Sequence, residues 1–374
     1  MKYMGSKRAM LTNGLGHLID KEIGKAKRFV DLFAGSAAVT RHAACRHDIP
    51  VLAFDLQHYS KVLAGAVLDR DQPLVADTVW HAWNKRAQAK FSRLVGIPIA
   101  DTINSKIVAV FRRWSAQQSS VITRAYGGHY FSPTQASWID SFLETLPSKN
   151  AEKNVALAAL IDAASQSAAA PGHTAQPFQP TRGASKYLEA SWKVDLPSKV
   201  ALGLKTLASI HAIQIGASKV ADANKAAQQV REGDLVFLDP PYSGVHYSRF
   251  YHVLETIART QCGEVSGTGR YPPPGERLRS LYSMKGEAVE ALDDLLATIA
   301  ARGGKAIVTF PDHECSNGLS GETIVDMSAE YFRIRIKEVD SRFSTLGGKI
   351  APDGGVGRGG RQYRSELILV LDPK

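Results

Sequence analysis

One short segment near the middle of the chain limits what the protein can fold into. The apolar residues 235–238 are followed at once by Asp239, two prolines and Tyr242. Such a run predicts a buried strand, and the prolines must end it because they cannot continue strand pairing. Open α/β sheets bind ligands at the edge where parallel strands end. The segment therefore predicts a rigid turn at a ligand-binding edge. The alternative is an ordinary strand-ending turn, in which Asp and Pro are common.

A second unit of the same kind lies near the amino terminus. Residues 28–33 predict a strand, residues 34–39 a turn of small residues, and the chain then enters a helix that runs toward His47. Small residues allow close backbone approach to a ligand, and a helix amino terminus offers free amides. The turn holds only one glycine, Gly35, so it lacks the GxGxxG pattern of a dinucleotide site. The pattern is that of the first unit of a nucleotide-binding α/β fold, and it does not support a pyrophosphate-binding dinucleotide site.

A third predicted strand, residues 51–55, ends in an acid. Asp55 follows Gly35 by 20 residues, an offset that suits a carboxylate accepting hydrogen bonds from ribose hydroxyls. The alternative role for Asp55 is a helix cap.

The chain is basic, with a net charge of +10 and a pI near 9.4. Between residues 81 and 130, Asp101 is the single acid among many Lys and Arg residues. These basic residues are Lys85, Arg86, Lys90, Arg93, Lys106, Arg112, Arg113 and Arg124, with Trp80, Trp83, Trp114, Tyr126 and Tyr130 interleaved. The mixture predicts phosphate contacts combined with stacking or wedging at bases. A solvated helical face is the alternative for any single charge.

Cysteine usage and hydropathy indicate the cellular compartment of the protein. Cys45, Cys262 and Cys315 lie far apart and form no CxxC pair, which argues against a structural zinc site or a disulfide framework and fits a reducing cytoplasm. No apolar run approaches 18 residues, and the amino terminus lacks a signal-peptide core. We expect a cytoplasmic protein that does not enter membranes and binds no metal.

The alternation of strand and helix is lost over residues 81–200, which predicts an insertion in the α/β domain. Within it we expect a helix over residues 134–146 capped by Ser132, a buried alanine-rich helix over 151–170, and a polar loop over 171–185 that carries Arg182. Such a loop could contact base edges or be a plain connector. Strand character is predicted again over residues 211–215, 220–222, 305–310, 331–339 and 366–371. Arg249, and Arg358 and Arg361 in a Gly-rich loop, are further candidates for DNA contacts.

Four motifs occur together in one order along the chain. They are Lys2-Tyr3-Met4-Gly5-Ser6-Lys7, Asp31-Leu32-Phe33-Ala34-Gly35-Ser36, Asp55, and Asp239-Pro240-Pro241-Tyr242. This set resembles the Dam-like, or D12, class of DNA adenine-N6 methyltransferases, with the motif order of its α group. The second glycine of that family's first motif is replaced here by Ala37.

The resemblance implies a Rossmann-like class I S-adenosylmethionine-dependent methyltransferase fold, discontinuous over residues 1–80 and 201–374. Residues 81–200 would be a mainly helical inserted target-recognition region. Locally, Tyr3 and Lys7 fit a solvated basic tail; the resemblance instead implies that they contact the methionine end of S-adenosylmethionine. The remaining residues implied for the cofactor are Asp31, Phe33, Gly35, Ser36, Asp55 for its ribose, and Asp222 for its adenine.

The resemblance also assigns the chemistry of the central turn. Asp239 and the Pro240 carbonyl would accept the two N–H groups of an adenine amine, and Tyr242 would stack on the base. The adenine must leave the duplex to reach the turn, so base flipping is implied. The expected partners are duplex DNA and a cognate restriction endonuclease, with the protein a monomer or dimer that joins the nucleoid when it binds DNA.

Other functions remain open from the sequence. Cytosine-N4 methyltransferases use similar chemistry but generally begin this motif with Ser, so Asp239 favours adenine. RNA is an alternative substrate because phosphate contacts do not distinguish the two nucleic acids. A non-catalytic DNA-binding relative is a third alternative.

Overall fold

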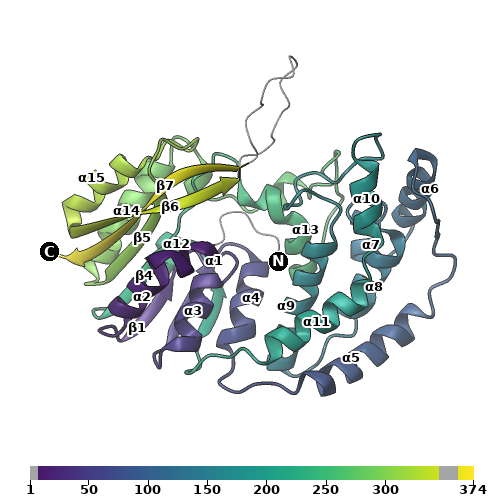
Figure 1. The fold of residues 1–374 in the computed structure, drawn as a ribbon, viewed down its shortest axis with the longest axis horizontal. Coiled ribbons are helices and arrows are strands. Elements are labelled where there is room, and N and C mark those ends of the chain that lie inside the picture. Colours follow the sequence, from purple (N-terminus) through teal and green to yellow (C-terminus); the bar gives the residue numbers. More distant parts are fainter. Residues whose placement is uncertain (1–6, 345–360) are drawn as a thin grey trace, which may run out of the picture. The chain divides into compact units, whose positions relative to one another are not determined.

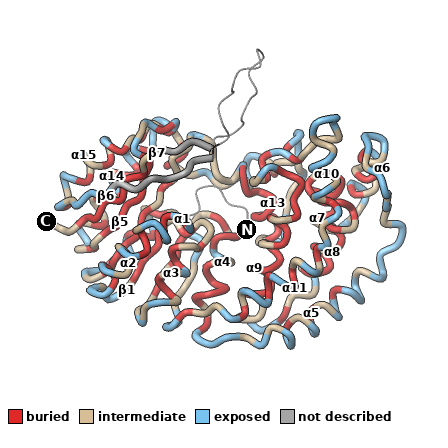
Figure 2. Tube along the Cα trace, viewed as in Figure 1, coloured by how far each residue is buried: buried red, intermediate tan, exposed pale blue. Residues whose placement is uncertain are grey.

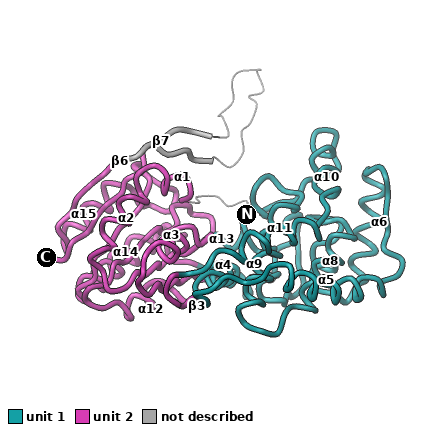
Figure 3. The backbone as a smooth tube through the Cα atoms, turned by 60° about the horizontal axis from the view of Figure 1, so that its bottom comes forward, with its two compact units in different colours: residues 1–3, 57–212, 247–279 teal, residues 4–56, 213–246, 280–374 magenta. Residues whose placement is uncertain are grey.

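The computed structural model describes the backbone of residues 7–344 and 361–374, and the side chains of residues 7–337 and 365–374. The chain divides into two compact units (Figure 3). Unit 1 contains residues 57–212 and 247–279, and unit 2 contains the described parts of residues 4–56, 213–246 and 280–374. These boundaries differ from the expected 81–200 insertion because helices on both sides of it pack inside unit 1. The assignment of roles to the two regions stays a prediction.

Seven strands of the described residues form one sheet in unit 2, in the order β3-β2-β1-β4-β5-β7-β6. Strands β1 to β5 pair in parallel, and β7 runs antiparallel between β5 and β6. The bounds are β1 Arg28–Asp31, β2 Val51–Asp55, β3 Ala217–Val220, β4 Asp234–Leu238, β5 Lys305–Pro311, β6 Phe332–Ser344 and β7 Arg361–Pro373 (Figure 1). The expected Rossmann-like α/β fold is confirmed.

The central strand β4 is buried on both faces because successive side chains of a strand point to opposite sides. Val236 and Leu238 pack in a core with residues of α12, α14 and α15, while the buried Leu235 and Phe237 point to the other face. An all-apolar strand is what a parallel sheet covered on both sides requires. The helices of unit 2 are α1 Arg8–Met10, α2 Gly16–Ile23, α3 Ala38–Arg46, α12 Ala223–Ala227, α14 Ala288–Ala301 and α15 Gly321–Tyr331, with a π-helical turn at Leu11–Leu15 and a 3₁₀ turn at Leu281–Ser283.

Unit 1 is helical, as expected for the insertion. Its core helix is α9, Asn150–Ser167, which is buried on nearly all sides after its first turn (Figure 2) and contacts α4, α8, α11 and α13. The other helices are α4 His58–Leu68, α5 Ala76–Phe91, α6 Ser105–Ala116, α7 Val121–Tyr126, α8 Pro133–Leu143, α10 Ser185–Trp192, α11 Leu196–Ala208 and α13 Tyr247–Arg259, with a 3₁₀ turn at Pro274–Glu276. Ser132 caps α8 in a capping box with Gln135, which confirms the predicted cap. Among the described residues, no helix is long and apolar enough to span a membrane.

The strand predicted over residues 211–215 is wrong. Backbone amides there bond to the ends of helices rather than to a strand: Ala212 donates to Val67 O, and Ile213 donates to Ala44 O. The strand lies instead at Ala217–Val220, where it forms the edge of the sheet beside β2. The short edge strand is half exposed, so its sequence has no apolar run to reveal it.

Candidate active site

A loop that follows β5 holds the turn after β4 in place. Asn317, fully buried, donates from Nδ2 to the Pro241 carbonyl at 2.8 Å and to the Tyr282 carbonyl at 2.9 Å. The Gly244 amide donates to Ser316 Oγ at 2.9 Å. The prolines restrict the turn's own dihedrals, and these contacts fix the turn to the rest of unit 2. Neither Asn317 nor Ser316 was indicated by the sequence.

Asp239 emerges at the end of the buried strand with one carboxylate oxygen occupied. Lys7 Nζ lies 3.0 Å from Oδ1, and Thr309 Oγ1 donates to the same oxygen at 3.1 Å. Within the described part of the chain, these contacts engage Oδ1 and leave Oδ2 for another donor. Burial raises the pKa of Asp239 to about 6, against the opposing effect of the Lys7 charge. Asp239 is therefore mostly ionised at neutral pH and can accept hydrogen bonds.

Lys7 is buried, with 6% of its side chain exposed, between two carboxylates. Besides Asp239 it donates to Glu366 Oε1, on β7, and Glu366 is 2% exposed. Burial lowers the pKa of Lys7, but the charges of Asp239 and Glu366 outweigh it and leave the pKa above its ordinary value. Lys7 is thus charged, and it is not a solvated tail residue.

The turn after β1 lies at the same sheet edge as Asp239. β1 pairs in parallel with both β2 and β4, so Asp31, Asp55 and Asp239 leave the sheet on one side. Asp31 is buried and accepts from Thr40 Oγ1 at 2.6 Å and from the Phe33 amide at 3.3 Å. Burial raises the pKa of Asp31 to about 7, and the nearby carboxylates of Asp239 and Asp55 add to this effect.

The backbone of this turn takes the left-handed conformation twice. Gly35 has φ 50° and Ala37 has φ 56°, and Ala37 is the N-cap of α3. The Gly35 amide donates to Asp55 Oδ2 at 2.8 Å, which ties the turn to the end of β2. The turn therefore brings backbone, rather than bulky side chains, to the edge beside Asp55.

The remaining predicted cofactor residues take varied positions. Phe33 packs edge-on against Tyr282 with ring centroids 5.0 Å apart, and Ser36 is half-buried in the same turn. Asp222 caps α12, accepting with Oδ1 from the amides of Asn224 at 3.1 Å and Lys225 at 3.3 Å. Tyr242 is half-buried and packs against the core of unit 2. Tyr3 lies outside the described residues.

The predicted DNA-contacting arginines fall into two groups. Arg113, Arg124 and Arg182 are exposed on unit 1. Arg112 is half-buried and donates to Gly128 O and Gln179 Oε1, both at 3.0 Å. Arg249 is exposed, but it donates to Tyr271 OH at 3.1 Å and lies over the Tyr271 ring. Arg358, and the side chain of Arg361, lie outside the described residues. Arg113, Arg124 and Arg182 are the better placed for phosphate contact, because the guanidinium groups of Arg112 and Arg249 are held by other side chains.

The expectation that the aromatics of residues 81–130 stack on bases is wrong for three of them. Trp83, Tyr126 and Tyr130 have no exposed surface. Trp83 donates to the Phe142 carbonyl at 3.1 Å, and Tyr126 shares a hydrogen bond with Thr256 at 2.8 Å. They form the core of unit 1, where large aromatic rings bury the most apolar area.

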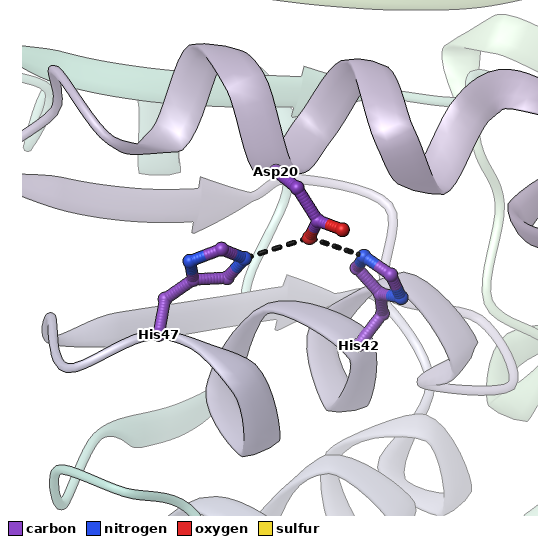
Figure 4. Close-up of side chains that lie close together, drawn as sticks. All are labelled: Asp20, His42 and His47. Atoms are coloured by element: carbon purple, nitrogen blue, oxygen red, sulfur yellow. Dashed lines mark hydrogen bonds and ion pairs between the residues drawn. The ribbon is translucent and has the colours of Figure 1, made fainter.

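One group of metal-ligand type occurs among the described residues, and sequence spacing did not indicate it. Asp20 on α2 lies against His42 of α3 and His47 just after α3 (Figure 4). His42 Nε2 and His47 Nε2 lie 2.8 and 2.7 Å from Asp20 Oδ1, and Arg46 Nη2 lies 3.7 Å from Oδ2. Burial would raise the pKa of Asp20, but these contacts lower it below its ordinary value. Hydrogen bonding between α2 and α3 accounts for the group, and the Arg46 charge opposes a cation there.

Comparison with known proteins supports the same family as the motifs. The model of the D12 class N6 adenine-specific DNA methyltransferases matches residues 3–109 and 202–270. The chain is 25% identical over 300 residues to modification methylase LlaI of Lactococcus lactis subsp. lactis, covering 80% of this chain and 44% of the relative. It is 27% identical over 307 residues to type II methyltransferase M.FokI of Planomicrobium okeanokoites, covering 79% and 42%. It is 24% identical over 308 residues to modification methylase StsI of Streptococcus sanguinis, covering 80% and 42%.

The parallel sheet with its antiparallel β7, and the acidic turns along one edge, define a class I methyltransferase fold. Over residues 3–109 and 202–270 the chain is similar to the D12 class N6 adenine-specific DNA methyltransferase family, the family that its motifs resemble. It spans less than half the length of each of the relatives that it matches.

Proposed function

We propose that the protein transfers a methyl group from S-adenosylmethionine to the N6 amine of an adenine in DNA. The observation that carries the proposal is Asp239, which follows the central strand: contacts with described residues, Lys7 and Thr309, hold its Oδ1 and leave Oδ2 for a substrate. The family match supports adenine in DNA as the target, and the names of the relatives support methyl transfer.

The residues at the sheet edge fit S-adenosylmethionine. The turn at Gly35 and Ala37 presents backbone close to the edge, as an adenosyl group requires. Asp55, which accepts the Gly35 amide with Oδ2 at the end of β2, is the carboxylate that would accept hydrogen bonds from ribose hydroxyls. A lysine ammonium carries three donors, and in the described part of the chain Lys7 uses two of them on Asp239 and Glu366. The third would serve the carboxylate of the cofactor. When bound, the cofactor supplies an activated methyl group.

The chain's own residues prepare the amine. The lone pair of an exocyclic adenine amine is delocalised into the ring, which makes it a poor nucleophile. Asp239 Oδ2 would accept one N–H and the Pro240 carbonyl the other, which favours a tetrahedral nitrogen with a localised lone pair. Tyr242 would stack on the base and set the plane of the ring. Positioning of this kind accounts for much of the acceleration when the methyl donor is already activated.

The nucleic-acid contacts follow from charge and exposure. Arg113, Arg124 and Arg182 are the described candidates for phosphate contact, and residues 81–200 are the proposed target-recognition region between catalytic segments 1–80 and 201–374. The base must flip out of the duplex to reach the turn. Because two of the relatives are named modification methylases, we extend the proposal to a modification role in the cytoplasm beside a cognate restriction endonuclease.

The test is methylation by the purified full chain. DNA that lacks N6-methyladenine is incubated with S-adenosylmethionine, digested to nucleosides and analysed by mass spectrometry. We expect N6-methyldeoxyadenosine. Asp239→Ala should lower the rate by about 10²–10³-fold or more, the scale for loss of one transition-state hydrogen bond, with little change in S-adenosylmethionine affinity by calorimetry. Asp294→Ala, an exposed acid on α14, is the matched control.

Other outcomes decide between the alternatives. N4-methylcytosine as the product would replace adenine as the target, and methylation of RNA but not DNA would replace the substrate. Failure of the wild type to bind S-adenosylmethionine would leave a DNA-binding relative without this chemistry. Long-read sequencing of DNA from cells that express the protein would give the recognition sequence.

A further inference from the structure

A second buried carboxylate, Glu366, shares a hydrogen-bonding partner with Asp239, although the two are remote in sequence. Glu366 is in β7, opposite Pro311 of β5, and it is 2% exposed. Its Oε1 accepts from Lys7 Nζ, and the same ammonium lies 3.0 Å from Asp239 Oδ1. Among the described residues, Lys7 is the side chain that links Glu366 to the proposed catalytic carboxylate.

A buried ion pair costs desolvation energy that a well-packed apolar pair does not, so it is weak evidence of a stabilising role. One ammonium here serves two carboxylates, and a third, Asp31, adds negative charge from β1. Stability alone does not explain a second buried acid beside Asp239. A role in holding the charged groups in position does explain it.

We propose that Glu366 is a positioning residue for methyl transfer: it anchors Lys7, and Lys7 in turn holds Asp239 Oδ1 so that Oδ2 faces the target amine. The inference rests on the proposed function. Without Glu366 the Lys7 ammonium would have Asp239 as its sole carboxylate partner among those it contacts here. Lys7 would then bind Asp239 more tightly and draw it away from the amine.

The groups around Asp239 give this proposal a signature in pH. Lys7 from the amino-terminal segment, Glu366 from β7, Thr309 from β5 and Asp31 from β1 all interact with Asp239. Lys7 lowers the pKa of Asp239, whereas Glu366 raises it. Removing the Glu366 charge therefore lowers the pKa of Asp239 from about 6, and activity should persist to lower pH before protonation of Asp239 abolishes it. A purely structural defect would lower the rate at every pH without shifting the acid limb of the pH–rate profile, the range in which activity falls as Asp239 becomes protonated.

The experiment is single-turnover methyl transfer to DNA from pH 4.5 to 8, with wild type, Glu366→Gln and Glu366→Asp. We expect Glu366→Gln to lower the maximal rate about 10- to 100-fold, the cost of misplacing a catalytic group, and to shift the acid limb to lower pH. Glu366→Asp, which keeps the charge but shortens the side chain, should recover part of the rate with a smaller shift. If Glu366→Gln unfolds, Glu366→Asp alone still tests both effects.

Glu22→Gln is the matched control. Glu22 is also buried and paired with two cations, Lys305 and Arg335, but Lys305 begins β5 at the opposite edge of the sheet from Asp239. It should lose stability without moving the acid limb. If the wild type is active and the Glu366 variants keep its maximal rate and its loss of activity at the same acidic pH, this inference alone is overturned. A wild type that methylates no DNA would overturn the proposed function, and the inference with it.

Discussion

At the scale of single residues, Ala37 shows how the site departs from the motif of the family that the chain resembles. Its position is that of the second glycine of the family motif, and its φ of 56° lies in the left-handed region. An L-residue there costs roughly 1–2 kcal/mol relative to the right-handed conformation. The sequence indicated a small residue at this position, but the backbone angle that makes glycine suitable became visible only in the structure.

We therefore predict that Ala37→Gly is nearly neutral for stability, because relief of the backbone strain offsets the buried methyl and the extra chain entropy. Ala43→Gly is the control: Ala43 is equally buried, but lies inside α3, where glycine costs about 1 kcal/mol. Midpoints of urea unfolding compare the two. A loss for Ala37→Gly as large as that for Ala43→Gly would mean that the left-handed turn carries no strain.

At the scale of elements, one buried arginine joins two helices of unit 1. Arg70 follows α4 and is 5% exposed. Its guanidinium donates to the carbonyls of Ala66 at 3.3 Å, Gln72 at 2.6 Å, Leu207 at 2.7 Å and Ile210 at 2.5 Å. The last two lie at the carboxyl end of α11. Positive charge there also interacts favourably with the helix dipoles.

Replacing Arg70 with Met would leave buried carbonyls without donors. Each such group costs about 1–3 kcal/mol, so we expect Arg70→Met to lower stability by about 3 kcal/mol or more, measured by urea unfolding. Arg86→Met is the control, since the exposed Arg86 donates to the Thr145 carbonyl at 3.1 Å and water can replace it. Equal losses in the two variants would refute a special role for Arg70.

The sequence predicted elements well where burial alone decides them. Residues 235–238 are apolar throughout and residues 306–308 form an apolar run, and both lie in central strands. The predictions were wrong where the hydrogen-bonding partners of a segment determine its structure. The edge strand Ala217–Val220 has polar residues, and residues 211–215 have apolar character yet bond to helix ends. The stacking prediction for Trp83 was wrong for a related reason: an aromatic residue among basic residues does not reveal which side of its helix is buried.

At the scale of the whole molecule, the site is assembled from distant segments. Asp239, Asp31 and Asp55 could be placed together from sequence because parallel strands end at one edge. Glu366, Thr309 and Asn317 could not, since each lies within a run whose pattern only predicts strand or loop. Their roles depend on contacts with residues as far apart as 359 positions.

The charge of the molecule leads to a prediction about DNA binding as a whole. Lys and Arg exceed Asp and Glu by 10, and each phosphate contact releases counterions, so affinity should fall steeply with salt. Arg113→Ala, Arg124→Ala and Arg182→Ala should each reduce the slope of log K against log salt by about 0.9 if each makes one phosphate contact. Fluorescence anisotropy with a labelled duplex measures the slope.

The control for this series is Arg302→Ala. Arg302 is exposed at the end of α14, just before β5 begins, so it lies at the edge of the sheet opposite Asp239. Its removal takes away one positive charge without touching the proposed DNA-contacting surface, and the slope should be unchanged. If Arg302→Ala and the three unit 1 variants reduced the slope equally, binding would follow net charge alone. A specific contribution of Arg113, Arg124 and Arg182 would then be excluded.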